Sequence, residues 1–244
     1  MTKAKQISIF ILTAILLVGL VVGIVAATKN RQANTCKGYV IKIENSGNKM
    51  LKEGVVKDFI KTRNLDPTGQ VCDSVDLEKI ERELSTIPLV SEVECYMLEN
   101  GKMMVEIGER MPLFHVKTNI SDYCIDTKGQ QMNTPKNLPE GIFKVTGDVT
   151  LEYAMQSLFP IIKYVTEDKA FAGEFHSMKV GGGNQISMKS KKFDYTVVLG
   201  TAERYEQKLD KLIRFRQYDK TGERQKMYKQ IDLQFRGQVV CKKK

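Results

Sequence analysis

One uncharged apolar run near the N-terminus constrains this 244-residue chain more than any other feature. The run covers Ile7–Ala27, and as a helix it rises about 30 Å, which is enough to cross the hydrocarbon core of a bilayer. No other stretch of the sequence approaches it in length and apolarity. We therefore expect a single transmembrane helix over residues 7–27, preceded by a tail over residues 1–6 and followed by a linker over residues 28–36.

A cleaved signal peptide is the alternative interpretation of this run. Signal peptides have shorter apolar regions, of about 7–15 residues, and Val25-Ala26-Ala27 resembles a cleavage site only loosely. We favour a retained anchor. Basic residues flank both ends of the run, so the positive-inside rule is nearly balanced. The short tail favours a cytoplasmic N-terminus, and this orientation places residues 38–244 outside the cytoplasm.

The basic excess of the chain lies at its two ends. The formal net charge is +9, yet residues 38–200 hold more acidic than basic side chains. A nucleic-acid-binding domain concentrates basic side chains together with base-reading groups on one folded face. The distribution of charge therefore argues against a nucleic-acid partner.

Residues 37–110 carry the pattern of one small α+β module. Alternating apolar residues predict a strand at 37–44, and two stretches with helical spacing follow it. Asp76 is placed to cap the second helix and Pro88 to stop it. Two more alternating stretches flank Asn100-Gly101, a dipeptide typical of tight hairpins. The order β-α-α-β-β predicts a three-stranded sheet with two helices on one face.

Residues 111–244 predict a larger, sheet-rich α+β domain. We expect one helix from Leu151 to Val165, disturbed at Pro160, and another from Tyr205 to Ile213, capped by Thr201. The final strand is expected over Ile231–Val240. The remaining strands are expected at 113–117, 123–126, 130–132, 142–146, 174–180, 185–190 and 195–199.

No residue set in the chain is typical of catalysis or of a bound cofactor. His115 and His176 lie far apart without ligands at metal-binding spacing, so we interpret both as structural. Gly181–Gly183 lacks a following Lys-Ser/Thr and a helix start, which indicates a hairpin turn and not a phosphate site. We expect no enzyme activity, no cofactor, no metal and no small-molecule substrate.

The five cysteines fit no metal-binding or C-x-x-C motif, because their number is odd and successive cysteines are 36, 23, 29 and 117 positions apart. We interpret them as buried or partly exposed thiols. One disulfide stays open as an alternative if the domain lies in an oxidising compartment.

The final strand is the predicted partner-binding surface. A last strand often lies at the edge of a sheet, where unpaired N–H and C=O groups invite a strand from a partner. Phe235 is the expected anchor, because aromatic residues dominate interface energetics. The alternative is a central strand paired on both sides, with Phe235 in the core. The predicted partner-binding residues are Ile231, Asp232, Leu233, Gln234, Phe235 and Val239.

A second set of candidate residues lies between the two folded segments. Pro112 fixes its own φ and pushes the preceding residue to an extended conformation. Arg110 can reach a carboxylate or the last carbonyl groups of the small module. We expect Arg110 and Pro112 to form an interdomain joint.

Short motifs in this order resemble those of the FtsQ/DivIB cell-division proteins, with the small module resembling their POTRA domain. Glu109-Arg110-Met111-Pro112 matches the E-R-x-P of that family, and Tyr123-Cys-Ile-Asp126 with Gly129 resembles its "lvD..G". Ile231-Asp-Leu-Gln-Phe235 resembles the terminal "vDLRY", with Gln234 in place of Arg and Phe235 in place of Tyr. Tryptophan, common at several family positions, is absent.

The resemblance implies a non-catalytic bitopic scaffold of the bacterial divisome. It implies binding of FtsB-like and FtsL-like proteins, which we expect to add a strand to the C-terminal strand, and recruitment of other divisome proteins through the POTRA domain. The expected location is the inner membrane, as a single-pass type II protein with a periplasmic bulk, enriched at the septum. One alternative is a POTRA-containing docking protein for envelope assembly or secretion. A membrane-tethered enzyme or sensor is another, which needs a polar pocket.

Overall fold

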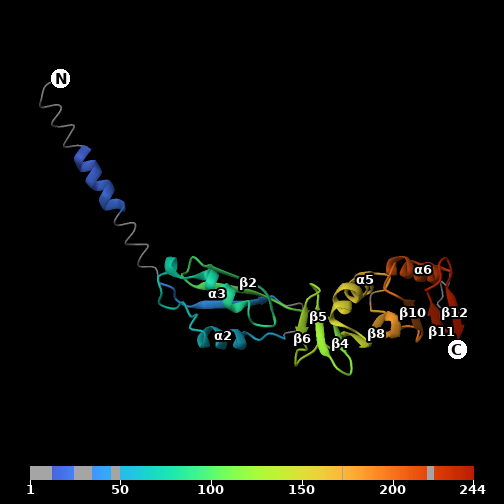
Figure 1. Ribbon diagram of the computed structural model, residues 1–244. Helices are drawn as coiled ribbons and strands as arrows, with labels where there is room; N and C mark the ends of the chain where they lie inside the picture. The colour runs from blue at the N-terminus through green and yellow to red at the C-terminus, as the bar shows by residue number, and fades with distance from the viewer. Residues whose placement is uncertain (1–12, 25–34, 45–49, 172, 219–222) are drawn as a thin grey trace, which may run out of the picture. The chain divides into compact units, whose positions relative to one another are not determined.

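The computed structural model describes residues 13–24, 35–44, 50–171, 173–218 and 223–244, and Figure 1 shows their secondary structure. The chain divides into two compact units, Met1–Glu109 and Arg110–Lys244.

Residues 13–24 form a helix whose apolar side chains are exposed, as shown by Ile15 at 64% and Leu16 at 66%. The rest of the expected transmembrane helix over 7–27 lies outside the described residues, as does the tail at 1–6. Among the residues that the structure describes, no helix combines the length and the apolar character needed to cross a membrane.

The smaller unit confirms the predicted β-α-α-β-β order. Its three-stranded sheet has the order β1-β3-β2, in which β3 runs parallel to β1 and antiparallel to β2. Both helices and one face of the sheet contribute to a single buried core that includes Val56, Ile60, Leu84 and Val105. The elements are β1 (Tyr39–Glu44), α2 (Glu53–Thr62), the short η1 (Cys72–Ser74), α3 (Leu77–Leu84), β2 (Val90–Met97) and β3 (Met103–Glu109).

Local signals in the sequence explain these boundaries. The carboxylate of Asp76 accepts a hydrogen bond from the Lys79 amide at 2.9 Å, so the predicted cap of α3 is confirmed. The helix ends before Pro88. Gly101 adopts φ +78° in the turn between β2 and β3, a conformation that glycine reaches without strain.

The larger unit is built on one nine-stranded mixed sheet. Its strand order is β12-β11-β10-β9-β8-β7-β4-β5-β6. The predicted α+β class is confirmed for this unit as well. Its strands are β4 (Pro112–Lys117), β5 (Asp122–Asp126), β6 (Gln131–Asn133), β7 (Phe143–Gly147), β8 (Phe175–Gly181), β9 (Gln185–Ser190), β10 (Thr196–Gly200), β11 (Tyr228–Asp232) and β12 (Val240–Lys243).

The two main helices of this unit, α5 and α6, lie along the same side of the sheet in Figure 1. The rings of Tyr164 and Tyr205 join them with an edge-on contact at 6.0 Å. The predicted disturbance is confirmed, because a π-helical turn precedes α5 and Pro160 lies in its first turn. The helices are α4 (Leu151–Tyr153), the π-helical η2 (Ala154–Leu158), α5 (Phe159–Glu167), α6 (Tyr205–Gln217) and α7 (Glu223–Lys226).

Two predictions for the second half of the chain are wrong, and one element is missing from them. Thr201 does not cap α6, since Arg204 occupies the N-cap in a left-handed conformation without a side-chain cap. The short helix α7 was not expected. The single strand over Ile231–Val240 is two strands, β11 and β12, separated by a loop in which Gly237 has φ +67°. A glycine inside a strand pattern often marks such a break.

The cysteines and histidines have structural environments. All five cysteines are free thiols, so the disulfide left open by the sequence is absent from the described residues. Burial raises the pKa of the Cys95 thiol to about 12 and that of Cys124 to about 11, which keeps both protonated. Buried His115 contacts the Asp122 carboxylate with its Nε2 at 2.7 Å, whereas His176 is exposed.

Candidate functional site

The strand β12 is one of the two edge strands of the large sheet as the structure describes it, and β6 is the other. Among the residues that the structure describes, β12 pairs with β11 on one side and has no strand on the other. The Lys244 amide donates to the Met227 carbonyl at 3.0 Å, so alternate residues of β12 face β11. By this alternation, the main-chain groups of Cys241 and Lys243 point to the outer side. They are available to a strand from another chain.

The residues predicted to bind a partner do not share one edge. Ile231 belongs to β11, which is paired with β10 and β12, so the open edge predicted there is wrong. Leu233 is buried, and its amide donates to the Val198 carbonyl at 2.9 Å. Phe235 is 53% exposed in the loop after β11, so its alternative placement in the core is wrong as well.

The remaining predicted residues lie at the end of β11 (Asp232) and in the loop between β11 and β12 (Gln234 and Val239), and this loop is internally braced. The Asp232 carboxylate accepts hydrogen bonds from the amide of Gln234 at 3.0 Å and from its side-chain nitrogen at 3.2 Å. The side chain of Val239 packs against the core of the larger unit. Both ends of the loop are therefore attached to the sheet, and Gln234 and Phe235 lie between them.

Lys211 on α6 is the central brace of this loop. Its ammonium donates to the carbonyl oxygens of Leu233, Phe235 and Gln238 at 2.7, 2.5 and 3.3 Å. Burial lowers the pKa of Lys211, and the nearby Asp232 opposes that effect. Three bonds from one cation hold the loop, and with it the start of β12, against α6. The sequence offered only helical spacing for Lys211 and no signal of these partners.

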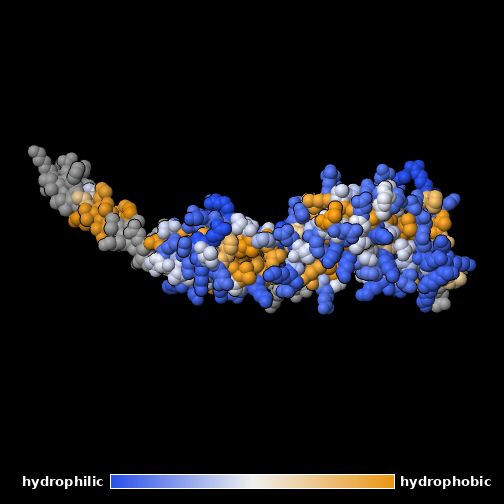
Figure 2. Space-filling model, turned by 60° about the horizontal axis from the view of Figure 1, so that its bottom comes forward, coloured by the Kyte–Doolittle hydropathy of each residue, from blue (hydrophilic) through white to orange (hydrophobic). Residues whose placement is uncertain are grey.

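The surface around β12 is strongly polar. Lys242, Lys243 and Lys244 are exposed next to this edge. Figure 2 shows hydrophilic side chains predominating where the C-terminal strands lie. Exposed Phe235 and Val240, at 53% and 46%, supply apolar contact area within this basic surface.

The residues of the predicted joint form contacts inside the larger unit. Arg110 donates from Nε and Nη2 to Asp126 at 2.9 and 2.7 Å, and from Nη2 to the Gln131 carbonyl at 3.0 Å. The other oxygen of Asp126 accepts the amides of Lys128 and Gln130, at 2.9 and 2.8 Å. These bonds fix Arg110 to the β5–β6 turn. Buried Pro112 begins β4. The role of both residues in an interdomain joint stays a prediction.

Two family models match the chain, one for each unit. The model described as "FtsQ/DivIB, C-terminal related" matches residues 111–242, and a POTRA-like domain matches residues 34–108. The first match alone covers more than half of the chain. The chain belongs to the FtsQ/DivIB family. No curated protein matches it.

The family assignment gives the general role of the chain. FtsQ/DivIB proteins are membrane-associated, non-enzymatic scaffolds of cell division that act through protein–protein interactions. An exposed sheet edge with a braced, aromatic-bearing loop suits such a role. Among the residues that the structure describes, no group of three or more His, Cys, Asp or Glu side chains could hold a metal ion.

Proposed function

We propose that this chain is a bitopic scaffold of the bacterial divisome that binds FtsB-like and FtsL-like proteins outside the cytoplasm. One observation carries the proposal: β12 is an open sheet edge in a chain of the FtsQ/DivIB family. In this proposal Ile7–Ala27 is a retained inner-membrane anchor with the N-terminus in the cytoplasm, and residues 38–244 are periplasmic. The scaffold links early division proteins to septal peptidoglycan synthesis.

Strand addition at β12 is the proposed mode of binding. A partner strand would obtain affinity from the outward main-chain groups of Cys241 and Lys243, and specificity from pockets for alternate side chains. Phe235 and Val240 would contribute apolar contacts. The lysines at 242–244 would speed encounter with an acidic partner segment, an effect that salt weakens.

Lys243→Pro should weaken this binding and leave the fold intact. Proline removes the outward amide of residue 243, which the ladder to β11 does not use, so the effect falls on the added strand. We expect the affinity for an FtsB–FtsL complex to fall by about tenfold, the equivalent of one lost hydrogen bond and its steric cost. Titration of the full chain in detergent with that complex measures the change.

Lys243→Ala is the matched control, because it removes the same charge and keeps the amide. Its affinity should stay within about threefold of the parent at physiological salt. Equal affinities for the proline and alanine variants, with unchanged melting temperatures, would exclude strand addition at β12.

The division role itself predicts where the protein lies in the cell. A fluorescent fusion of the full chain should fractionate with membranes and concentrate at midcell during constriction. A uniform envelope signal in dividing cells would contradict the proposed role. Cleavage near Thr28 in the membrane-purified protein would contradict the anchor.

The smaller unit has a separate part in the proposal. Its POTRA-like fold suggests a recruitment site for other divisome proteins. The alternative function, a docking protein for envelope assembly or secretion, rests on this module alone. The match over residues 111–242 favours the division scaffold.

A further inference from the structure

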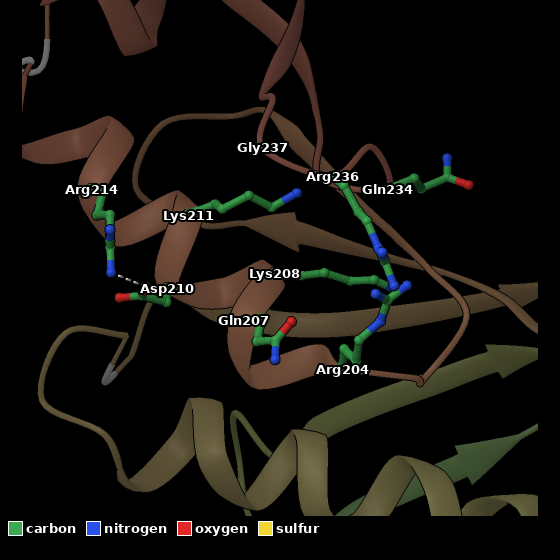
Figure 3. Close-up of a pocket in the computed structure, with 9 residues that line it drawn as sticks. All are labelled: Arg204, Gln207, Lys208, Asp210, Lys211, Arg214, Gln234, Arg236 and Gly237. Carbon is green, nitrogen blue, oxygen red and sulfur yellow. Dashed lines mark ion pairs between the residues drawn. The ribbon is translucent and has the colours of Figure 1, made fainter.

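A groove of about 560 Å³ lies between α6 and the loop that joins β11 to β12, and its lining is rich in cations. Figure 3 shows the side chains around it. Five of the lining residues are basic and only Asp210 is acidic. The basic residues are Arg204, Lys208, Lys211, Arg214 and Arg236.

Two of these cations already have partners. Arg214 forms an ion pair with Asp210 at 2.9 Å, four residues before it on α6. Lys211 is occupied by the three carbonyl groups of the loop. Neither is free to bind a ligand in the groove without giving up these contacts.

Among the described residues, the other three cations form no ion pair. Within the part of the chain that the structure describes, no carboxylate forms an ion pair with Arg204, Lys208 or Arg236; Lys208 donates only to the Thr201 carbonyl, at 2.8 Å. Lys208 is buried at 8% exposure, while both arginines are exposed at the rim. Figure 3 shows the ends of these three side chains pointing toward one another.

This arrangement is electrostatically unfavourable without an anion. Burial lowers the pKa of Lys208, and the positive charge of Arg204 lowers it further, although Glu203 acts in the opposite direction. A negative group among the three cations would remove the repulsion and accept their hydrogen bonds.

We propose that Arg204, Lys208 and Arg236 bind a phosphate group. Three donors that point toward one place suit a compact anion with several acceptor oxygens, and phosphate has this form. A single carboxylate offers two oxygens to these three side chains, and the next carboxylate on the same face of an extended acidic peptide lies about 7 Å away, so phosphate matches the three donors better. The inference does not depend on the division role. The phosphate could be a soluble phosphate ester or a lipid headgroup.

Inorganic phosphate is the first probe, added to the full chain in detergent at constant ionic strength. Ligand that binds the folded state alone raises the melting temperature in a saturable manner, which yields the affinity. Arg204→Gln and Arg236→Gln should each weaken binding by about tenfold, since each removes a charge-assisted contact. Both side chains are exposed, so the unliganded melting temperature should not change.

Arg214→Gln is the matched control. It removes the same charge from the rim of the same groove, but its guanidinium is paired with Asp210. Phosphate affinity should change by less than about twofold. An equal loss of phosphate affinity in the control would show that the effect is general electrostatic attraction, and it would contradict the proposed site. The absence of saturable phosphate binding would contradict it as well.

Further probes separate the sources of the phosphate. Tighter binding to micelles with phosphatidylglycerol than to soluble glycerol phosphate, and none to phosphatidylcholine micelles, would identify a lipid headgroup. Similar affinities for phosphatidylglycerol and glycerol phosphate would identify a soluble ester. A glutamate-rich peptide that binds more tightly than every phosphate probe, with the same sensitivity to Arg236→Gln, would overturn the proposal in favour of an acidic protein segment.

Discussion

Arg216→Met should lower the free energy of unfolding of the larger unit by about 3–5 kcal/mol. Arg216, near the end of α6, donates to the Glu174 carboxylate and to the Tyr195 hydroxyl, the latter at 2.9 Å. The Glu174 side chain is 7% exposed and that of Arg216 is 15% exposed, so both partners of this ion pair are largely buried. The guanidinium also lies over the Phe171 ring, 5.3 Å from its centre.

The size of this effect comes from the carboxylate that would be left behind. Tyr195, which is fully buried, would still donate to Glu174 at 3.1 Å, but one neutral hydrogen bond does not compensate a buried charge. Methionine keeps the apolar volume of the arginine stem. The loss is therefore mainly electrostatic and not a packing defect.

Urea unfolding of the full chain in detergent measures the change, followed by the near-ultraviolet signal of the tyrosines. Arg214→Met is the control on the same helix, because its partner Asp210 is half exposed. We expect this variant to lower the free energy of unfolding by less than about 0.5 kcal/mol. The double variant Glu174→Gln with Arg216→Met should recover part of the loss, since it removes the buried charge as well. A single variant as stable as the parent would contradict this account.

The sequence predicted the elements that depend on local periodicity and turn chemistry. In the smaller unit, Asp76, Pro88 and Gly101 fix a helix start, a helix end and a hairpin, and each acts within a few residues of its position. The β-α-α-β-β order followed from them. Similar reasoning found the disturbance at Pro160, because a proline in a helical pattern has a local consequence.

The candidate site depended on interactions that sequence spacing does not contain. The strand expected over Ile231–Val240 fitted an alternating pattern, and only Gly237 indicated the break that moves the open edge to β12. The brace from Lys211 joins residues more than twenty positions apart, and the convergence of Arg204 and Arg236 depends on how α6 packs against that loop. These are tertiary contacts, and a single sequence shows such residues only as ordinary surface charges.

The largest loss of stability is expected for Gly147→Ala. Gly147 ends β7 with φ +103°, and a Cβ atom there would lie 1.9 Å from the Val180 carbonyl oxygen on β8. The same oxygen accepts the Asp148 amide at 3.0 Å, so the two strands cannot separate locally without losing this bond. The clash is with backbone in the middle of the nine-stranded sheet, where no flexible side chain can move aside.

We expect Gly147→Ala to lower the free energy of unfolding of the larger unit by more than about 4 kcal/mol. A loss of that size is a large part of the total stability of a typical domain. Circular dichroism of the full chain during heating measures the change. Gly141→Ala isolates the contribution of the backbone conformation, because Gly141 also has positive φ, +80°, but a Cβ there meets nothing within 4 Å. Alanine at 141 should therefore cost only about 1–2 kcal/mol from the strained φ. The difference in melting temperature between the two variants measures the effect of the close approach of β7 to β8. Equal melting temperatures would show that this contact relaxes without cost.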